Sequence, residues 1–182
     1  QMIKVLTSVM VLFILTDIFR HKIDWIQFLF KSFFNSMLRS HEIDGKLTGA
    51  TWVMIGAVIT ITLFSKPVAI IALIFMSLGD TVAGLIGQRF GKHKIGDKTW
   101  EGFFGGLIIC IIIALNFPYL PLMVSLIGAI TAMIIELIPI PLDDNFIIPL
   151  GSGAIMMMLS TPILCPFYFL LSYAAFLLYR FP

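Results

Sequence analysis

An aspartate stands within a long apolar stretch of this 182-residue chain. Counted from Pro67 at about 1.5 Å per residue, Asp80 would lie roughly 20 Å along a helix. If that helix spans a membrane, Asp80 is about 10 Å from the edge of a hydrocarbon core about 30 Å thick. A carboxylate at that depth must be paired, hydrated or bound to a metal, and it marks a functional site by default. The alternative is a structural aspartate that bonds a neighbouring helix.

Small residues recur around this aspartate at every fourth position. They are Gly79, Ala83, Gly87 and Gly91, and Gly84 adds a further small position. This spacing lets a second helix backbone approach closely. We expect this face to pack against another helix beside the site, a role compatible with a function there.

A basic, glycine-rich loop follows the aspartate, over residues 89–102. It contains four cationic residues within ten positions: Arg89, Lys92, Lys94 and Lys98. Exposed backbone N–H groups and mobile cationic side chains suit a phosphate group. A helix beginning near Thr99 would add the attraction of its N-terminal dipole. The loop therefore predicts a phosphate cradle, and the alternative is a cytoplasmic loop that binds lipid headgroups.

Acidic residues also gather at a proline-rich turn near the end of another apolar stretch. Glu136 precedes the adjacent acids Asp143 and Asp144 by about two helical turns, and Asn145 follows them. Mg²⁺ takes oxygen ligands and usually keeps waters and substrate phosphates. The pattern therefore predicts a site for a hard cation. The alternative is a helix cap, in which Asp144 or Asn145 begins a helix over 146–160.

The composition indicates whether the protein is soluble or lies in a membrane. Hydrophobic residues make up 59% of the chain and charged residues 12%, against about 45–50% and 25% in a soluble domain. So few charges cannot cover a soluble surface, which excludes a soluble enzyme and a disordered chain and makes nucleic acid an unexpected partner. Cys110 and Cys165 lie in apolar runs, so we expect packing residues and no disulfide or metal pair.

We therefore predict an all-α, polytopic membrane bundle that forms a single domain over 1–182, with about seven transmembrane helices. A span needs about 20 apolar residues, and continuous apolar runs favour helices over a barrel. The expected spans are 3–19, 48–64, 67–87, 102–117, 120–138, 146–160 and 163–179. Residues 22–39 place polar and apolar side chains on opposite sides of a helix, which predicts an interfacial amphipathic helix. The alternative there is an eighth span.

Seven spans place nearly all charges on one side of the membrane. Of the twelve lysines and arginines, only Lys4 and Lys66 fall on the other side. The positive-inside rule makes the basic side cytoplasmic. All ten acidic residues fall on that side or in the half-membrane nearest to it. A site at this face would meet cytosolic nucleotides and membrane lipids together.

Three ordered motifs resemble a known family. They are Gly79-Asp80-x-x-Ala83-x-x-x-Gly87-x-x-x-Gly91, Lys98-Thr99-Trp100-Glu101-Gly102 and Glu136-x-x-Pro139-x-x-x-Asp143-Asp144-Asn145-x-x-x-Pro149, preceded by Arg39-x-x-Glu42 and Gly49-Ala50-Thr51. In this order they resemble the CTP-dependent lipid kinases, namely the polyprenol (dolichol), phytol and diacylglycerol kinases, which are related to the phosphatidate cytidylyltransferases. The resemblance covers residues 39–153 in detail.

The resemblance implies an activity and a location. It implies transfer of the γ-phosphate of CTP to a lipid hydroxyl, with Mg²⁺, by a multi-pass integral membrane catalytic domain. The site would lie on the cytoplasmic side of a prokaryotic cell membrane or an ER-type membrane. The expected partners are CTP and the lipid, and a homodimer stays open. The family usually has an Arg-Lys-x-x-His segment on an additional N-terminal helix, so either the natural start lies upstream of Gln1 or the active site lacks one basic contribution.

The resemblance also implies roles for individual residues. The expected metal ligands are Asp80, Glu136, Asp143 and Asp144. The expected nucleotide-binding residues are Arg89, Gly91, Lys92, Lys94, Lys98, Thr99, Glu101 and Asn145. The expected catalytic residues are Asp80, Lys98, Asp143 and Asp144, and one of the two adjacent aspartates would accept the hydroxyl proton.

Two other functions remain open at this point. The 98–102 motif is closer to the cytidylyltransferases, whereas the 143–145 motif is closer to the kinases. A cytidylyltransferase would use the same residues for attack on the α-phosphate of CTP and would release pyrophosphate. An ion-coupled transporter would use Asp80 and Glu136 as coupling groups. Transporters bind near the midplane and often contain repeats, whereas this sequence shows no internal repeat and its acids gather at one face.

Overall fold

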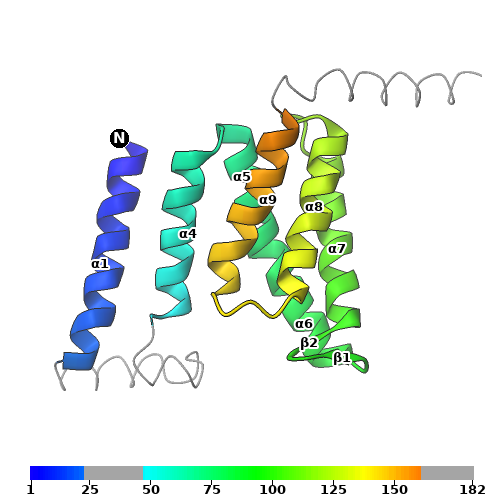
Figure 1. Ribbon diagram of the computed structural model, residues 1–182, viewed down its shortest axis with the longest axis horizontal. Coiled ribbons are helices and arrows are strands. Elements are labelled where there is room, and N and C mark those ends of the chain that lie inside the picture. Colours follow the sequence, from blue (N-terminus) through cyan, green and yellow to red (C-terminus); the bar gives the residue numbers. More distant parts are fainter. Residues whose placement is uncertain (23–46, 161–182) are drawn as a thin grey trace, which may run out of the picture.

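A computed structural model describes residues 1–22 and 47–160, which form a bundle of helices with one small β-hairpin (Figure 1). This architecture confirms the predicted all-α class. The elements, in chain order, are α1 (Met2–Lys22), α4 (Gly49–Leu63), α5 (Lys66–Ile74), the π-helix η1 (Phe75–Asp80), α6 (Thr81–Phe90), β1 (Lys94–Ile95), β2 (Lys98–Thr99), α7 (Trp100–Leu115), α8 (Leu122–Leu137) and α9 (Asp144–Ser160).

Six of the seven expected spans coincide with helices to within a few residues. The seventh span, 163–179, lies outside the described residues, as does the expected interfacial helix 22–39 apart from its first residue. Helices α5, η1 and α6 form one continuous helix, Lys66–Phe90, which by length and composition can cross a membrane. Helices α4, α7, α8 and α9 are apolar but shorter. The number of seven spans therefore stays a prediction.

The connections between helices divide between the two ends of the bundle. The C-terminal end of α1, the β-hairpin and the connection from α8 to α9 lie at one end (Figure 1). The α4–α5 and α7–α8 connections lie at the opposite end. The charged loops 88–101 and 139–145, which the sequence places on one side, therefore do meet at one end.

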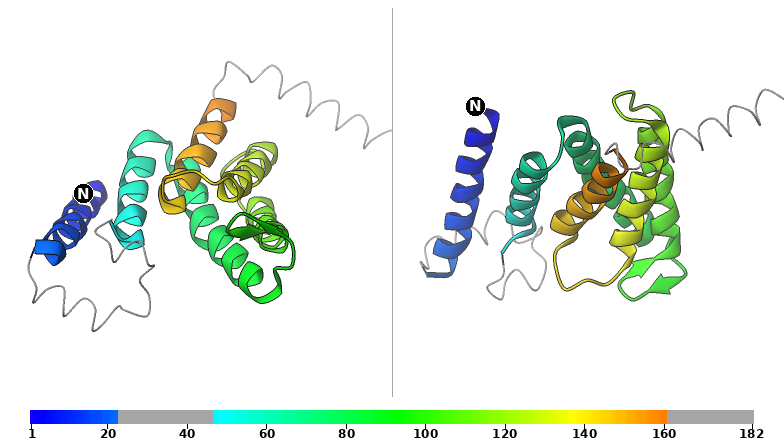
Figure 2. Two further views of the ribbon diagram at one scale, coloured as in Figure 1. Left: turned by 60° about the horizontal axis from the view of Figure 1, so that its bottom comes forward. Right: turned by 45° about the horizontal axis from the view of Figure 1, so that its top comes forward.

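The core lies between the α5–η1 segment and the helices α7, α8 and α9. Its largest side chains, all fully buried, include Ile71, Phe75, Met133, Ile148 and Met156. Helix α1 packs against α4 at the edge of the bundle, as both views in Figure 2 show. Many of its apolar side chains are exposed, for example Leu12 at 61%. Such a surface suits an apolar solvent such as a lipid bilayer.

The small residues around Asp80 allow a close approach between helices, as predicted. A Cβ added at Gly102 of α7 would lie 2.6 Å from the carbonyl oxygen of Ala83, and one at Gly106 would lie 2.8 Å from that of Gly79. Only glycine fits such contacts without displacing a backbone. Gly84 differs, because a Cβ there would meet no atom within 4 Å.

Candidate active site

A pocket of about 1610 Å³ opens at the hairpin end of the bundle. Its walls come from α4, the end of η1, α6, the hairpin, the first turn of α7, the end of α8 and the connection between α8 and α9. The charged residues that line it are Asp80, Lys94, Asp97, Lys98, Glu136, Asp143 and Asp144. The fold therefore brings all three sequence motifs to one cavity.

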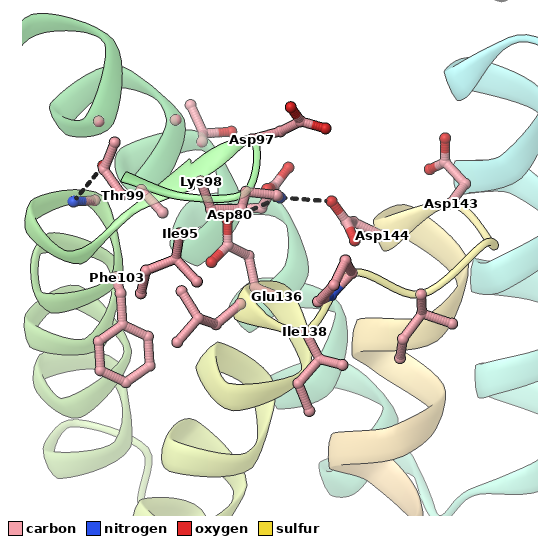
Figure 3. A pocket seen from close by; sticks show the side chains of 18 of the residues that line it. Asp80, Ile95, Asp97, Lys98, Thr99, Phe103, Glu136, Ile138, Asp143 and Asp144 are labelled. Carbon is pink, nitrogen blue, oxygen red and sulfur yellow. Dashed lines mark hydrogen bonds and ion pairs between the residues drawn. The ribbon is translucent and has the colours of Figure 1, made fainter. Parts of the chain in front are cut away.

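Lys98 is the centre of the charged group in this pocket (Figure 3). Its Nζ donates hydrogen bonds to Glu136 Oε1 at 2.9 Å and to Asp144 Oδ2 at 2.7 Å. Burial alone would lower the pKa of Lys98, but the hydrogen bonds and charges of Asp144 and Glu136 outweigh it and raise the pKa above its usual value. The lysine therefore stays charged and holds two carboxylates from separate helices.

The hairpin fixes the position of this lysine. Lys94 pairs with Thr99 and Ile95 with Lys98, which leaves Gly96 and Asp97 as a two-residue turn. Gly96 has a φ of +59°, as type II′ hairpin turns require at their first central residue. Thr99 then caps α7, because its Oγ1 accepts a hydrogen bond from the N–H of Gly102 at 3.1 Å. The helix start expected near Thr99 is thus confirmed.

Glu136 is buried in the last turn of α8, with 4% of its side chain exposed. Its Oε1 binds Lys98, whereas its Oε2 has no hydrogen-bond partner among the described residues. A carboxylate at the C-terminal end of a helix also lies against the negative end of the helix dipole. Buried unsatisfied oxygens are rare and costly, and they occur at catalytic and ion-binding sites. Glu136 therefore has the environment of a functional carboxylate.

Asp80 reaches the same group from the middle of the long helix. It is the last residue of η1, the π-helical turn of Phe75–Asp80. Single π turns inside α-helices are rare overall, and those that occur are often at functional sites. Asp80 lines the pocket, and Figure 3 shows its side chain beside Lys98 and Glu136.

The adjacent acids of the third motif have different roles in the structure. Asp143 caps α9, because its Oδ1 accepts hydrogen bonds from the backbone N–H of Asn145 at 3.0 Å and from Asn145 Nδ2 at 2.7 Å. Its carbonyl oxygen also accepts from the N–H of Ile147. The sequence placed the cap at Asp144 or Asn145, so that alternative is wrong by one or two positions. Asp144 instead turns its carboxylate toward Lys98, apart from Asp143 (Figure 3).

The four expected metal ligands line one pocket without forming a closed cage. Within residues 1–22 and 47–160, no three Asp, Glu, His or Cys side chains are grouped closely enough to hold a metal ion. Mg²⁺ usually needs only one or two carboxylates, with waters and substrate phosphates as the other ligands. The unpartnered Oε2 of Glu136 and the carboxylate of Asp80 fit that smaller requirement.

The expected nucleotide-binding residues divide into two groups. Four of them line the pocket, namely Gly91, Lys94, Lys98 and Thr99, whereas Arg89, Lys92, Glu101 and Asn145 are not among its lining residues. The guanidinium of Arg89 lies 5.7 Å from the ring centre of Phe90. Glu101 Oε1 lies 2.7 Å from His93 Nδ1, and this hydrogen bond lowers the pKa of Glu101 to about 2.

Sequence reasoning missed a second polar cluster and part of the pocket wall. Asp17, Thr48 and Thr51 form a buried hydrogen-bonded group between α1 and α4. Gln88 lines the pocket beside Gly84. The signal for Gln88 was its spacing, because residues 80, 84 and 88 share one face of a helix. Asp17 had no such signal, since its partners lie more than 30 positions away.

Comparison with known proteins finds similarity to proteins that are named as lipid kinases. The chain is 27% identical over 158 residues to an uncharacterised protein of Rickettsia prowazekii, a match that covers 78% of this chain and 77% of that protein. It is 27% identical over 144 residues to a probable chloroplastic phytol kinase of Triticum aestivum, covering 68% and 48%. It is 28% identical over 174 residues to CTP-dependent diacylglycerol kinase 1 of Saccharomyces cerevisiae, covering 80% and 59%.

The chain thus spans about half the length of that phytol kinase and 59% of the yeast enzyme. No family model and no solved structure matches it. The names of these two kinases nevertheless agree with the family that the three motifs resemble. The resemblance of this chain to the CTP-dependent lipid kinase family is therefore confirmed.

Proposed function

We propose that the protein is a membrane lipid kinase that transfers the γ-phosphate of CTP to the hydroxyl of a lipid alcohol. The observation that carries this proposal is the bridge from Lys98 to Glu136 and Asp144, beside Asp80, in a pocket at one end of an apolar bundle. The similarity to a phytol kinase and to a CTP-dependent diacylglycerol kinase supports the choice of reaction.

The cationic and the acidic side chains of the pocket would have different roles. Lys94 and Lys98 come from the hairpin and would bind the triphosphate, because ammonium groups neutralise phosphate charge. Asp80 and Glu136 would hold Mg²⁺ on the nucleotide, and the ion would neutralise charge on the phosphates during transfer. Phosphoryl transfer needs mainly positioning and charge neutralisation, which this set of side chains can supply.

The reaction then needs a proton acceptor for the lipid hydroxyl. The hydroxyl oxygen attacks the γ-phosphorus, the bond from that phosphorus to the bridging oxygen breaks, and CDP leaves with the electron pair. The hydroxyl proton passes to a carboxylate. Asp144 is better placed for this step than Asp143, because Asp144 faces Lys98 whereas Asp143 Oδ1 is bound by Asn145.

Labelled CTP tests the proposal directly. The protein, reconstituted in liposomes with Mg²⁺ and a polyprenol, phytol or diacylglycerol, is given CTP labelled at either the γ or the α position. Label in the lipid from γ alone supports the kinase. Label from α, with a lipid phosphate as acceptor, would establish the cytidylyltransferase instead. No label from either position, with any acceptor, overturns both enzymes and favours a transporter.

A pair of variants connects the activity with the pocket. Asp80→Asn should abolish transfer while the protein remains inserted in the membrane. Asp17→Asn is the matched control, because Asp17 is a buried carboxylate outside the pocket lining. Wild-type turnover in Asp80→Asn would contradict the assignment. Removal of Mg²⁺ with EDTA should stop transfer, and turnover that continues would exclude the metal from the reaction.

A further inference from the structure

Gly84 is a glycine that helix packing does not explain. Gly79 and Gly87 lie on the same long helix and Gly91 caps its C-terminal end, and a Cβ at any of these three glycines would lie too close to a side-chain or backbone atom. A Cβ at Gly84 would meet no atom within 4 Å. Glycine also costs helix stability relative to alanine. The residue is exposed and lines the pocket one helical turn from Asp80.

Both lysines that line the pocket come from the hairpin, whereas α4 contributes no charged residue to the lining. The hairpin side carries Lys94 and Lys98, which suit phosphate. The α4 side carries Leu47 and Trp52, and Leu85 of α6 is apolar as well. Trp52 is held in place by Phe146, with ring centroids 5.6 Å apart. An amphiphilic acceptor would therefore place its chain on the α4 side and its hydroxyl toward the charged group.

Glu136 is independent evidence that the cavity is built for a ligand. Its side chain is only 4% exposed, it lines the pocket, and its Oε2 has no partner among the described residues. A bound water, ion or ligand group would satisfy this oxygen. The reacting groups would therefore meet near Glu136 and Asp80, and Gly84 lies on the wall immediately beside that point.

We propose that Gly84 is a specificity-determining residue, whose missing side chain leaves the space beside Asp80 through which the chain of the lipid alcohol passes. The inference rests on the proposed function. Thr81 and Gln88 flank Gly84 on the pocket wall. A side chain at 84 would occupy the free space beside them. Added bulk there should therefore exclude long acceptors more strongly than short ones.

The test compares a long and a short acceptor with the same reacting end. Geranylgeraniol and 3-methylbut-2-en-1-ol are both primary allylic alcohols, and they differ in chain length. Gly84→Leu should raise KM for geranylgeraniol by about tenfold or more, since a misfit of a few methylenes has effects of that order. KM for CTP should change by less than twofold. The kcat/KM for the short alcohol should stay within threefold of wild type.

Ser77→Leu is the matched control, because it adds the same side chain to an exposed position of the same helix outside the pocket lining. It should leave both KM values unchanged. Gly84→Ala serves as a second variant if the leucine variant is unstable. Alanine fits the helix and the free space, so its melting temperature should equal or exceed that of wild type. Its KM for geranylgeraniol should still rise.

The outcomes separate this inference from the proposed function. If the wild type phosphorylates neither alcohol nor any other lipid alcohol, the proposed function has failed. If the wild type is active but both Gly84 variants keep its KM for the long acceptor, Gly84 does not determine specificity. An increase in KM for CTP alone would place the nucleotide at Gly84 and overturn the inference. A changed oligomeric state in Gly84→Leu, measured by light scattering, would assign the glycine to a contact between subunits.

Discussion

Two buried carboxylates lie in different parts of the bundle and have different hydrogen-bond partners. Asp17 of α1 is 3% exposed and Glu136 of α8 is 4% exposed. Asp17 Oδ2 accepts hydrogen bonds from the N–H of Thr48 at 2.8 Å, from Thr48 Oγ1 at 3.0 Å and from Thr51 Oγ1 at 2.6 Å. Glu136 has one oxygen on Lys98 and, within the described part of the chain, no partner for the other.

The difference separates a structural carboxylate from a functional one. Thr48 and Thr51, which donate three hydrogen bonds to Asp17, are neutral residues at the start of α4, so these bonds fix α1 against α4. The partner of Glu136 is a flexible cationic side chain that can also bind phosphate. Equal burial therefore does not imply equal function. The hydrogen bonds from backbone and hydroxyl groups at Asp17, and the flexible cationic partner at Glu136, distinguish the two sites.

The largest expected effect is on catalysis at Glu136. Glu136→Gln removes the charge that Lys98 binds and the proposed metal ligand, while it keeps the size of the side chain. We expect the rate of γ-phosphate transfer to fall by about 10²–10³-fold, the range found when one preorganised electrostatic contact is removed. The melting temperature should change little. Lys66→Met, at the opposite end of the bundle, is a control and should keep full activity. A variant with normal turnover would make Glu136 structural, like Asp17.

The second effect is on stability at Asp17. Asp17→Ala leaves the N–H of Thr48 and two hydroxyls without their acceptor in a buried place. We expect a loss of about 2–4 kcal/mol in the free energy of unfolding, because hydrogen bonds to charged groups are each worth about 1.5–3 kcal/mol and are not additive. Denaturant unfolding in detergent measures this loss.

Transfer by Asp17→Ala, assayed below its melting temperature, should stay within about threefold of wild type, because Asp17 does not line the pocket. A loss of turnover in a fully folded Asp17 variant would remove the distinction between the two carboxylates.

The sequence predicts the helices better than it predicts which buried carboxylate is structural and which is functional. Long apolar runs define the helices, and the hydroxyl of Thr99 marks the start of α7. The small residues from Gly79 to Gly91 predict a close helix contact, because spacing alone determines which side chains share a face. These features are local in the sequence, so one segment contains all the information needed.

The parts that sequence reasoning missed depend on geometry between segments. The partners of Asp17 lie 31 and 34 positions away, and no local pattern identifies them. Asp143 and Asp144 differ by one position, which is about 100° around a helix. The exact start of α9 therefore decides which acid caps the helix and which faces Lys98. The π turn before Asp80 adds a further rotation that hydropathy does not reveal.

A smaller effect is expected when one hydroxyl is removed from the hydrogen-bonded group of Asp17, Thr48 and Thr51. Thr51→Val removes the hydroxyl that lies 2.6 Å from Asp17 Oδ2 and keeps the shape of the side chain. The backbone N–H and the hydroxyl of Thr48 still bind the carboxylate. We therefore expect a loss of about 1–2 kcal/mol in the free energy of unfolding, less than in Asp17→Ala. Thr51→Ser should recover most of it. A cost equal to that of Asp17→Ala would mean that this one hydroxyl holds α1 against α4.

The smallest effect concerns a third carboxylate, Glu101, which is partly exposed and has a movable partner. The hydrogen bond from His93 lowers the pKa of Glu101 from 4.5 to about 2. A carboxyl whose pKa is lowered in the folded state stabilises that state above its usual pKa and loses this contribution as the pH falls from about 4.5 toward 2.

His93→Ala should therefore raise the pKa of Glu101 toward 4.5, as measured by NMR titration of a ¹³C-labelled Glu101 carboxyl. Lys66→Met, at the opposite end of the bundle, is the control and should leave that pKa unchanged. Because Glu101 is outside the pocket lining, γ-phosphate transfer at pH 7 should change by less than twofold. A large loss of transfer in His93→Ala would show that an exposed pair at the hairpin, and not burial, controls the position of Lys98.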